Sequence, residues 1–114
     1  IGDRLLQVTI ADISGVPVAG AGLPVLYWFI NGVPQPAVTA THISGTLYEF
    51  IFGAAAVLGD IVSYYVVAQD NIGNVIAQPS TGAAGYTANP PAATTAPSTP
   101  GSYTIQPLLP AYDS

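Results

Sequence analysis

Residues 62–74, VSYYVVAQDNIGN, describe a β-strand that runs into a turn. Successive side chains of a strand point to opposite faces, so a half-buried strand alternates apolar with polar residues. One face of this strand is apolar, because it carries Val62, Tyr64, Val66 and Ala68. The other face carries Tyr65 and Val67, so it is apolar as well. The stretch therefore predicts a strand packed on a core, whose opposite face needs a second cover.

The rest of the chain predicts an all-β fold. Strand-like runs occupy six segments: residues 4–11, 25–30, 37–42, 46–52, 61–69 and 75–78. Asn31-Gly32 is a strong turn signal, because both residues tolerate positive φ. Pro34 and Pro36 place the third of these segments at a sheet edge, since proline cannot donate to a ladder. No segment has the 3.6-residue apolar period and the capping signals of a helix.

The composition limits the partners. The chain has 114 residues and a mass of 11.6 kDa, which suits one domain of ordinary size. Charged residues are 6% of it, against roughly 25% in typical soluble domains. One arginine, no lysine and a net charge of −5 exclude nucleic acid, which needs clustered cations. No apolar run approaches the roughly 20 residues of a membrane helix, and the absence of cysteine excludes disulfides and thiolate metal sites.

The composition changes at Pro79. From there on, prolines recur among Ala, Thr, Ser, Gly and Asn, with few large apolar side chains. We therefore expect a β-sandwich over residues 1–78 and an extended arm or linker over residues 79–114. A short strand-like piece, residues 102–105, lies within the arm and has no evident partner in the hairpin order.

Several motifs resemble a known family. Leu58 lies six residues before Tyr64, a spacing similar to the tyrosine corner of fibronectin type III and immunoglobulin-like sandwiches. Four further motifs resemble bacterial immunoglobulin-like repeats of large secreted surface proteins: DISG at 12–15, LYWFING at 26–32, GTLYEF at 45–50 and AQDNIGN at 68–74. The resemblance covers about residues 5–78.

This resemblance implies an immunoglobulin-like β-sandwich of about seven strands, located outside the cell or on its surface, with Tyr64 at the corner. It makes residues 4–11 the second strand of the family, so the family's first strand is missing from this chain. A missing edge strand leaves backbone groups that another chain, or residues 102–105, could satisfy. The resemblance also places strands 25–30 and 61–69 side by side.

Strand 25–30, VLYWFI, is apolar on both faces, like the opening stretch. Two adjacent strands with this pattern predict one outward apolar patch, covered by copies of the chain or by neighbouring domains. The expected interface draws on both strands and on the C-terminal piece: Tyr65, Val67, Trp28, Tyr27, Tyr103 and Ile105. The alternative is that aromatic residues on an exposed strand face are simply good strand formers.

The turn after the opening strand offers weak calcium ligands. Asp70 and Asn74 carry suitable oxygens, and Asp12 follows a strand whose loop lies at the same end of such a sandwich. The simpler interpretation is that each aspartate closes an Asx-turn, with Gly15, Gly73 and Asn74 supplying positive φ. The chain lacks the dense carboxylate spacing of an EF-hand, so we expect no cofactor.

Catalytic chemistry has little support. His42 is the only imidazole. The chain contains no cysteine that it could activate, and no carboxylate lies next to it in the sequence to orient it. The six acidic residues fall on termini, turns and one strand face. Paired catalytic carboxylates need a cleft, which a small sandwich seldom provides. We expect no enzyme.

We therefore expect a structural subunit or repeat module of an extracellular or cell-surface assembly, such as a filament or an adhesin stalk. Head-to-tail contacts would form by β-strand addition and through the outward apolar face. The alternative is a glycan- or surface-binding module of a large secreted protein, with its site in the loops after Asp12 and Asp70. Carbohydrate would then bind through aromatic side chains and polar partners.

Overall fold

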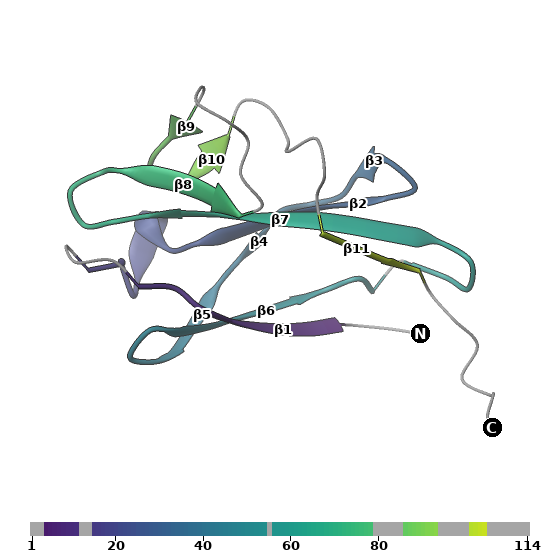
Figure 1. Ribbon diagram of the computed structural model, residues 1–114, viewed down its shortest axis with the longest axis horizontal. Coiled ribbons are helices and arrows are strands. Elements are labelled where there is room, and N and C mark those ends of the chain that lie inside the picture. Colours follow the sequence, from purple (N-terminus) through teal and green to yellow (C-terminus); the bar gives the residue numbers. More distant parts are fainter. Residues whose placement is uncertain (1–3, 12–14, 55, 79–85, 94–100, 105–114) are drawn as a thin grey trace.

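The computed structural model describes residues 4–11, 15–54, 56–78, 86–93 and 101–104. These residues form two antiparallel β-sheets packed face to face, with a small hairpin on the outside of one sheet (Figure 1). They contain no α-helix, and their single 3-10 turn spans Gly20–Gly22. The prediction of an all-β sandwich is confirmed.

The first sheet has three strands, in the order β1-β6-β5: Arg4–Thr9, Leu47–Phe52 and Thr41–Ser44. β1 pairs with β6 along its whole length, from Arg4 opposite Phe52 to Thr9 opposite Leu47. Among the described residues, no strand pairs with the other edge of β1. β1 is therefore an edge strand in this structure.

The second sheet follows the order β11-β7-β2-β3: Gly101–Thr104, Ile61–Gln69, Val25–Ile30 and Val33–Pro34. β8 (Val75–Gln78) pairs with residues 66–69 of β7, and β11 pairs with residues 61–64. Because β2 occupies one edge of β7, β8 and β11 follow each other along the opposite edge. The bounds of β2, β7 and β8 are those predicted from the sequence.

The C-terminal strand pairs within its own chain. The backbone of Gly101 lies opposite Tyr64, and that of Thr104 lies opposite Ile61. The sequence leaves open whether residues 102–105 pair with their own domain or with another molecule. In the structure, β11 extends the second sheet of the same chain.

The segment after β2 changes sheets. Asn31 and Gly32 make the predicted turn into β3, with φ of 49° and 82°. β4 (Val38–Thr39) then pairs with β2, whereas β5 pairs with β6 in the other sheet. Ala40, between these two strands, is buried, with only 4% of its surface exposed. The prediction of one edge strand over residues 37–42 is wrong, because the chain crosses from sheet to sheet at this point.

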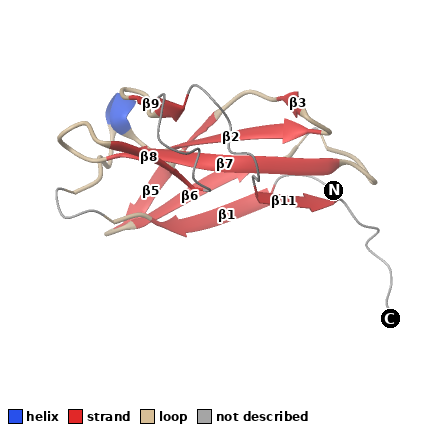
Figure 2. Cartoon of the chain, turned by 45° about the horizontal axis from the view of Figure 1, so that its top comes forward, coloured by secondary structure: helices blue, strands red, loops and turns tan. Residues whose placement is uncertain are grey.

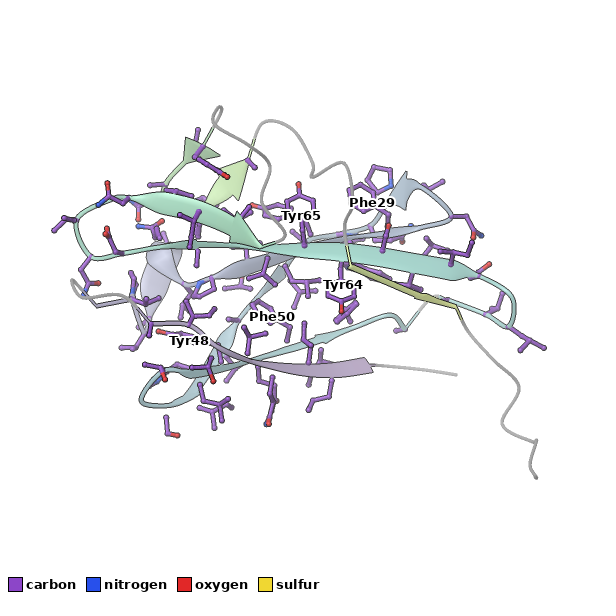
Figure 3. All side chains as sticks on the ribbon, in the orientation of Figure 1. Phe29, Tyr48, Phe50, Tyr64 and Tyr65 are labelled. Atoms are coloured by element: carbon purple, nitrogen blue, oxygen red, sulfur yellow. The ribbon has the colours of Figure 1, made fainter. Side chains whose placement is uncertain are left out.

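The core lies between the two sheets. Tyr48 and Phe50 of β6 are almost completely buried there (Figure 3). β2 and β7 supply the opposing wall: Leu26, Trp28, Val62 and Val66. The Trp28 ring meets Phe52 edge-on at 5.7 Å, and its Nε1–H donates to the Pro36 carbonyl at 2.8 Å. Aromatic side chains, with their large buried areas, therefore dominate this core.

A second, smaller apolar cluster lies on the outer face of the second sheet. A short hairpin covers it, formed by β9 (Tyr86–Thr87) and β10 (Ala92–Ala93). Figures 1 and 2 show this hairpin beside β7 and β8, on the side away from the first sheet. The sequence assigns these residues to an extended arm and predicts no strand among them.

Candidate interaction surfaces

The outer face of the second sheet holds Tyr65 and Tyr27, two of the aromatic side chains in the predicted interface. Tyr65 packs between Tyr27 and Phe29 of β2, with ring centroids 5.3 Å and 6.2 Å away. Tyr65 is 6% exposed, and Val67 is fully buried. Figure 3 shows Tyr65 and Phe29 on the side of β7 opposite to Tyr64. The two apolar faces of β7 thus serve two separate clusters.

The cover of this outer face comes from the same chain. Tyr86 of β9 and Ala93 of β10 pack against the cluster, together with Ala77 of β8. This corrects the expectation that Tyr65 and Val67 are covered by another molecule or domain. An internal hairpin accounts for their apolar character, and it leaves neither side chain accessible to a partner in this conformation.

Polar contacts hold the hairpin on the sheet. The Tyr27 hydroxyl donates to the Pro91 carbonyl at 2.7 Å. The Asn89 N–H donates to Gln69 Oε1 at 2.8 Å, and Gln69 Nε2 donates to Asn89 Oδ1 at 3.1 Å. Burial raises the pKa of Tyr27, and the neighbouring Tyr65 raises it further, so the hydroxyl remains a donor. The hairpin is therefore anchored on both β2 and β7.

The other predicted interface residues lie elsewhere. Trp28 is 7% exposed and belongs to the core, so its assignment to an interface is wrong. Tyr103 lies in β11, where its backbone pairs opposite Val62. Ile105 lies outside the described residues. The three remaining residues of the predicted set lie together on the covered face.

Asp70 closes the turn between β7 and β8. Its Oδ1 accepts from the N–H groups of Ile72 at 3.0 Å and Asn74 at 2.8 Å, and its Oδ2 accepts from Asn74 Nδ2 at 2.9 Å. Burial alone would raise the pKa of Asp70, but the bonds from Asn74, Ile72 and Gly73 outweigh burial and lower the pKa below its ordinary value of 3.8. The ionised carboxylate thus serves the turn, which supports the Asx-turn interpretation.

The predicted calcium ligands form no described cluster. Asp12 lies outside the described residues. Within the part of the chain that the structure describes, no three His, Asp or Glu side chains converge to hold a metal ion. Gly15 and Gly73 have the predicted positive φ, 79° and 94°. Asn74 does not have positive φ, which corrects its predicted role, because it donates to Asp70 instead.

A polar hollow of about 450 Å³ lies beside this turn. Amide and carboxylate side chains contribute to its lining: Gln69, Asp70, Asn71 and Asn89. Its described lining contains no aromatic ring. The hollow therefore lacks the aromatic surface on which the glycan-binding alternative depends.

The tyrosine-corner prediction pairs Tyr64 with Leu58. In the structure, the Tyr64 ring packs on Phe52 with centroids 5.4 Å apart, while Leu58 is 54% exposed. Leu58 therefore leaves about half of its surface exposed. Gly101 of β11 lies against the Tyr64 ring, since a Cβ added at this glycine would stand 2.9 Å from Tyr64 Cζ.

A different tyrosine bonds the backbone from within the core. The Tyr48 hydroxyl donates to the carbonyls of Pro17 at 3.0 Å and Val16 at 3.2 Å. Burial raises the pKa of Tyr48. This contact ties β6 to the connection between β1 and β2, and the sequence gives no signal for it.

His42 lies on β5, an edge strand of the first sheet, as the sequence predicts. Its Nε2 stands 2.9 Å from the Gly45 carbonyl oxygen, and its ring packs on Tyr48 with centroids 5.2 Å apart. The imidazole therefore holds the turn between β5 and β6.

An apolar groove of about 560 Å³ opens along one side of the sandwich. Inward side chains of β1, of β7 and of Ile10 just after β1 line it: Leu6, Val8, Ile10, Tyr64, Val66 and Ala68. Ile76 of β8 and Gly101 of β11 also border it, and Ile76 is 68% exposed. The sequence indicates a missing neighbour for β1 but not this groove, because the alternation of β1 is also that of an ordinary core strand.

No protein-family model matches the chain, and no curated protein matches it significantly. No helix in the described part of the chain has the length and apolar character needed to cross a membrane. The functional assignment therefore depends on the surfaces of the molecule itself.

Proposed function

We propose that the chain is a structural module of an extracellular or cell-surface assembly, joined to its neighbour by β-strand addition. The observation that carries this proposal is the edge of β1 that no described strand pairs with, beside the apolar groove. An extended segment laid there would bond the backbone of β1 and cover apolar side chains of both sheets. Such head-to-tail contacts propagate without closing, which suits a filament or a stalk.

The strand order supports an immunoglobulin-like identity for the sandwich. β1, β6 and β5 follow the order that such folds give to strands B, E and D. β11, β7 and β2 follow the order of strands G, F and C. By this order, the position beside β1 that no described strand occupies corresponds to strand A. The resemblance to repeats of secreted surface proteins is the basis for the proposed location.

Half of the exposed large apolar side chains of the described residues lie at one end of the molecule and favour a contact there. These five belong to the ends of β1, β6 and β7 and to the β6–β7 connection, and each is between 48% and 58% exposed: Leu5, Ile51, Val57, Leu58 and Ile61. With the outer face of the second sheet covered by its own hairpin, this end supplies the apolar contact of the proposed assembly.

The polar side chains support a structural role without catalysis. Asp70 closes the β7–β8 turn, and His42 holds the β5–β6 turn. Asp60 accepts from the Val57 N–H at 2.9 Å and from Asn31 Nδ2 at 2.9 Å. Each of these groups stabilises a local connection of the sandwich.

Sedimentation velocity and negative-stain electron microscopy of the purified chain test the proposal. We expect oligomers that grow with concentration and short linear particles in the micromolar range. A chain that remains monomeric up to hundreds of micromolar would contradict it.

The alternative, a glycan-binding module, has the polar hollow beside Asp70 as its candidate site. Binding there should shift amide resonances of Asn71 and Gly73 in titrations with sugars. Because the described lining lacks an aromatic ring, we expect no saturable shift at millimolar sugar.

A further inference from the structure

The edge of β1 that faces no other described strand has a defined hydrogen-bonding phase. The N–H of Ile10, just after β1, donates to the Thr46 carbonyl at 2.8 Å, on the side of β6. Because bonding groups alternate along an antiparallel strand, Leu6 and Val8 also direct their backbone groups towards β6. The backbone groups at the open edge belong to the exposed, outward-facing residues: Leu5, Gln7 and Thr9.

We propose that this edge and the adjoining groove receive residues 105–109 of a second copy, added as a strand antiparallel to β1. The inference rests on the proposed function and specifies its contact. The added strand would bond the outward-facing residues of β1 through its backbone. Its alternate side chains would lie over the groove, opposite Leu6, Val8 and Ile10.

The polarity of the strands favours a second copy over the molecule's own tail. Arg4, at the start of β1, lies opposite Phe52, the last residue of β6 before the connection to β7. Thr104, at the end of β11, lies opposite Ile61, the first residue of β7, so β11 ends at the pole where β1 starts (Figure 1). β11 therefore runs antiparallel to β1 and ends at this pole.

A second copy, displaced along the strand direction beyond the end of β11, would present the Ile10 end of its groove to the segment that follows Thr104. The segment can then enter without reversing and run antiparallel to β1 of the second copy. The molecule's own tail would have to turn back and lie parallel to β1. The contact between copies is heterologous and leaves one unfilled groove and one unused segment at the ends, so the chain of copies stays open.

The sequence after β11 has the pattern that the groove requires. If residues 105–109, IQPLL, were extended, Ile105, Pro107 and Leu109 would share one face, and Gln106 and Leu108 the other. In the proposed pairing Ile105, Pro107 and Leu109 lie opposite the inward residues of β1, where backbone N–H groups point away from β1. Pro107, which has no N–H, therefore loses no hydrogen bond to β1. Pro110 falls in the bonding phase and ends the pairing. The added strand thus spans roughly 17 Å, close to the length of six-residue β1 at about 3.4 Å per residue.

Because the chain contains no cysteine, disulfide formation between two introduced cysteines tests the contact. Antiparallel pairing that begins with Ile105 opposite Ile10 places Leu109 opposite Leu6. We expect full-length Leu6→Cys and full-length Leu109→Cys, when mixed and oxidised, to form linked heterodimers. Leu5→Cys is the matched control: its side chain is 55% exposed on the outer face of the same strand, and its yield with Leu109→Cys should be at least about tenfold lower.

A second measurement does not depend on crosslinking. Leu109→Asp would place a charge in the apolar groove, so the association constant from sedimentation should fall at least about tenfold. Gln106→Asp changes a residue in the outward phase of the same segment and should retain association.

The outcomes separate this inference from the proposed function. Oligomers that persist in Leu109→Asp, without the Leu6–Leu109 crosslink, would overturn the inference and leave the proposed function standing. A chain that is monomeric at every concentration would contradict both. An intramolecular disulfide in a Leu6→Cys/Leu109→Cys chain at high dilution would assign the groove to the molecule's own tail and overturn the second-copy contact.

Discussion

Gly101 and Tyr64 decide how closely β11 can approach β7. A methyl group at position 101 would stand 2.9 Å from Tyr64 Cζ, and the Tyr64 ring is itself packed on Phe52. We therefore expect Gly101→Ala to lower the free energy of unfolding by about 1–3 kcal/mol, through overpacking. Urea denaturation followed by tryptophan fluorescence measures this change.

A double-mutant cycle identifies the cause of that loss. Tyr64→Leu shortens the side chain that Gly101→Ala would meet, so the alanine should cost less in this background. Equal losses in both backgrounds would show that the ring contact is not the reason.

Asp70 should make stability depend on pH. Its folded-state pKa is lowered, so the stability it contributes is fully present above its ordinary unfolded pKa of 3.8 and is lost as the pH falls through the folded pKa. Asp70→Asn cannot titrate there, so its melting temperature should fall less steeply than that of the wild type below about pH 5. Thermal melts across this range measure the difference, and parallel curves would contradict it.

Local chemistry made some residues predictable and others not. Asn31 and Gly32 form the predicted turn because positive φ depends on the residues themselves. Asn74 is also an asparagine beside a glycine, but its side chain donates to Asp70, and its conformation depends on the hydrogen bonds of the whole turn. The sequence predicts the wrong surface for Trp28, because a strand that is apolar on both faces does not reveal which face meets the core.

At the scale of elements, the β9–β10 hairpin explains the second apolar face of β7, although the sequence could not place it. Its strands have two residues each, within a Pro-rich region. Such short strands carry no periodicity, and their position depends on contacts with residues far away in the chain, such as Tyr27 with Pro91. The long strands were predictable because each has a clear pattern of its own.

Tyr27 should control the attachment of this hairpin. Tyr27→Phe removes the bond to the Pro91 carbonyl and keeps the ring stacked on Tyr65, so we expect a loss of about 0.5–1.5 kcal/mol. Hydrogen exchange should quicken selectively at the hairpin amides, because the bond fixes that element rather than the core.

Tyr48→Phe is the matched control for that substitution. It removes the bonds to the Pro17 and Val16 carbonyls inside the core and should lower stability without selective exchange at β9 and β10. Similar exchange profiles in the two variants would show that the Tyr27 bond does not anchor the hairpin.

At the scale of the whole molecule, the unusually apolar composition has two different explanations. Some of the apolar residues lie under the β9–β10 hairpin, so they give no evidence of a partner. The groove beside β1 and the exposed residues near Leu5 and Ile61 remain uncovered in the described structure. The sequence could indicate that the chain is unusually apolar, but it could not divide that property between internal and external cover, because the division depends on where residues 86–93 lie.

The same charge balance predicts how association responds to salt. Each copy carries a net charge of −5 with a single cation, so copies repel one another at neutral pH, and the proposed groove contact is apolar. Raising the ionic strength from about 0.01 M to about 0.1 M shortens the Debye length from about 30 Å to about 10 Å and screens this repulsion. We therefore expect the association constant, measured by sedimentation, to rise with salt over that range. Gln106→Lys makes the net charge less negative and lies in the outward phase of the proposed added strand. This variant should associate more tightly at low salt, and its association should depend less on salt. Association that weakens as salt is added would instead indicate attraction between opposite charges, and would contradict an apolar contact between these acidic molecules.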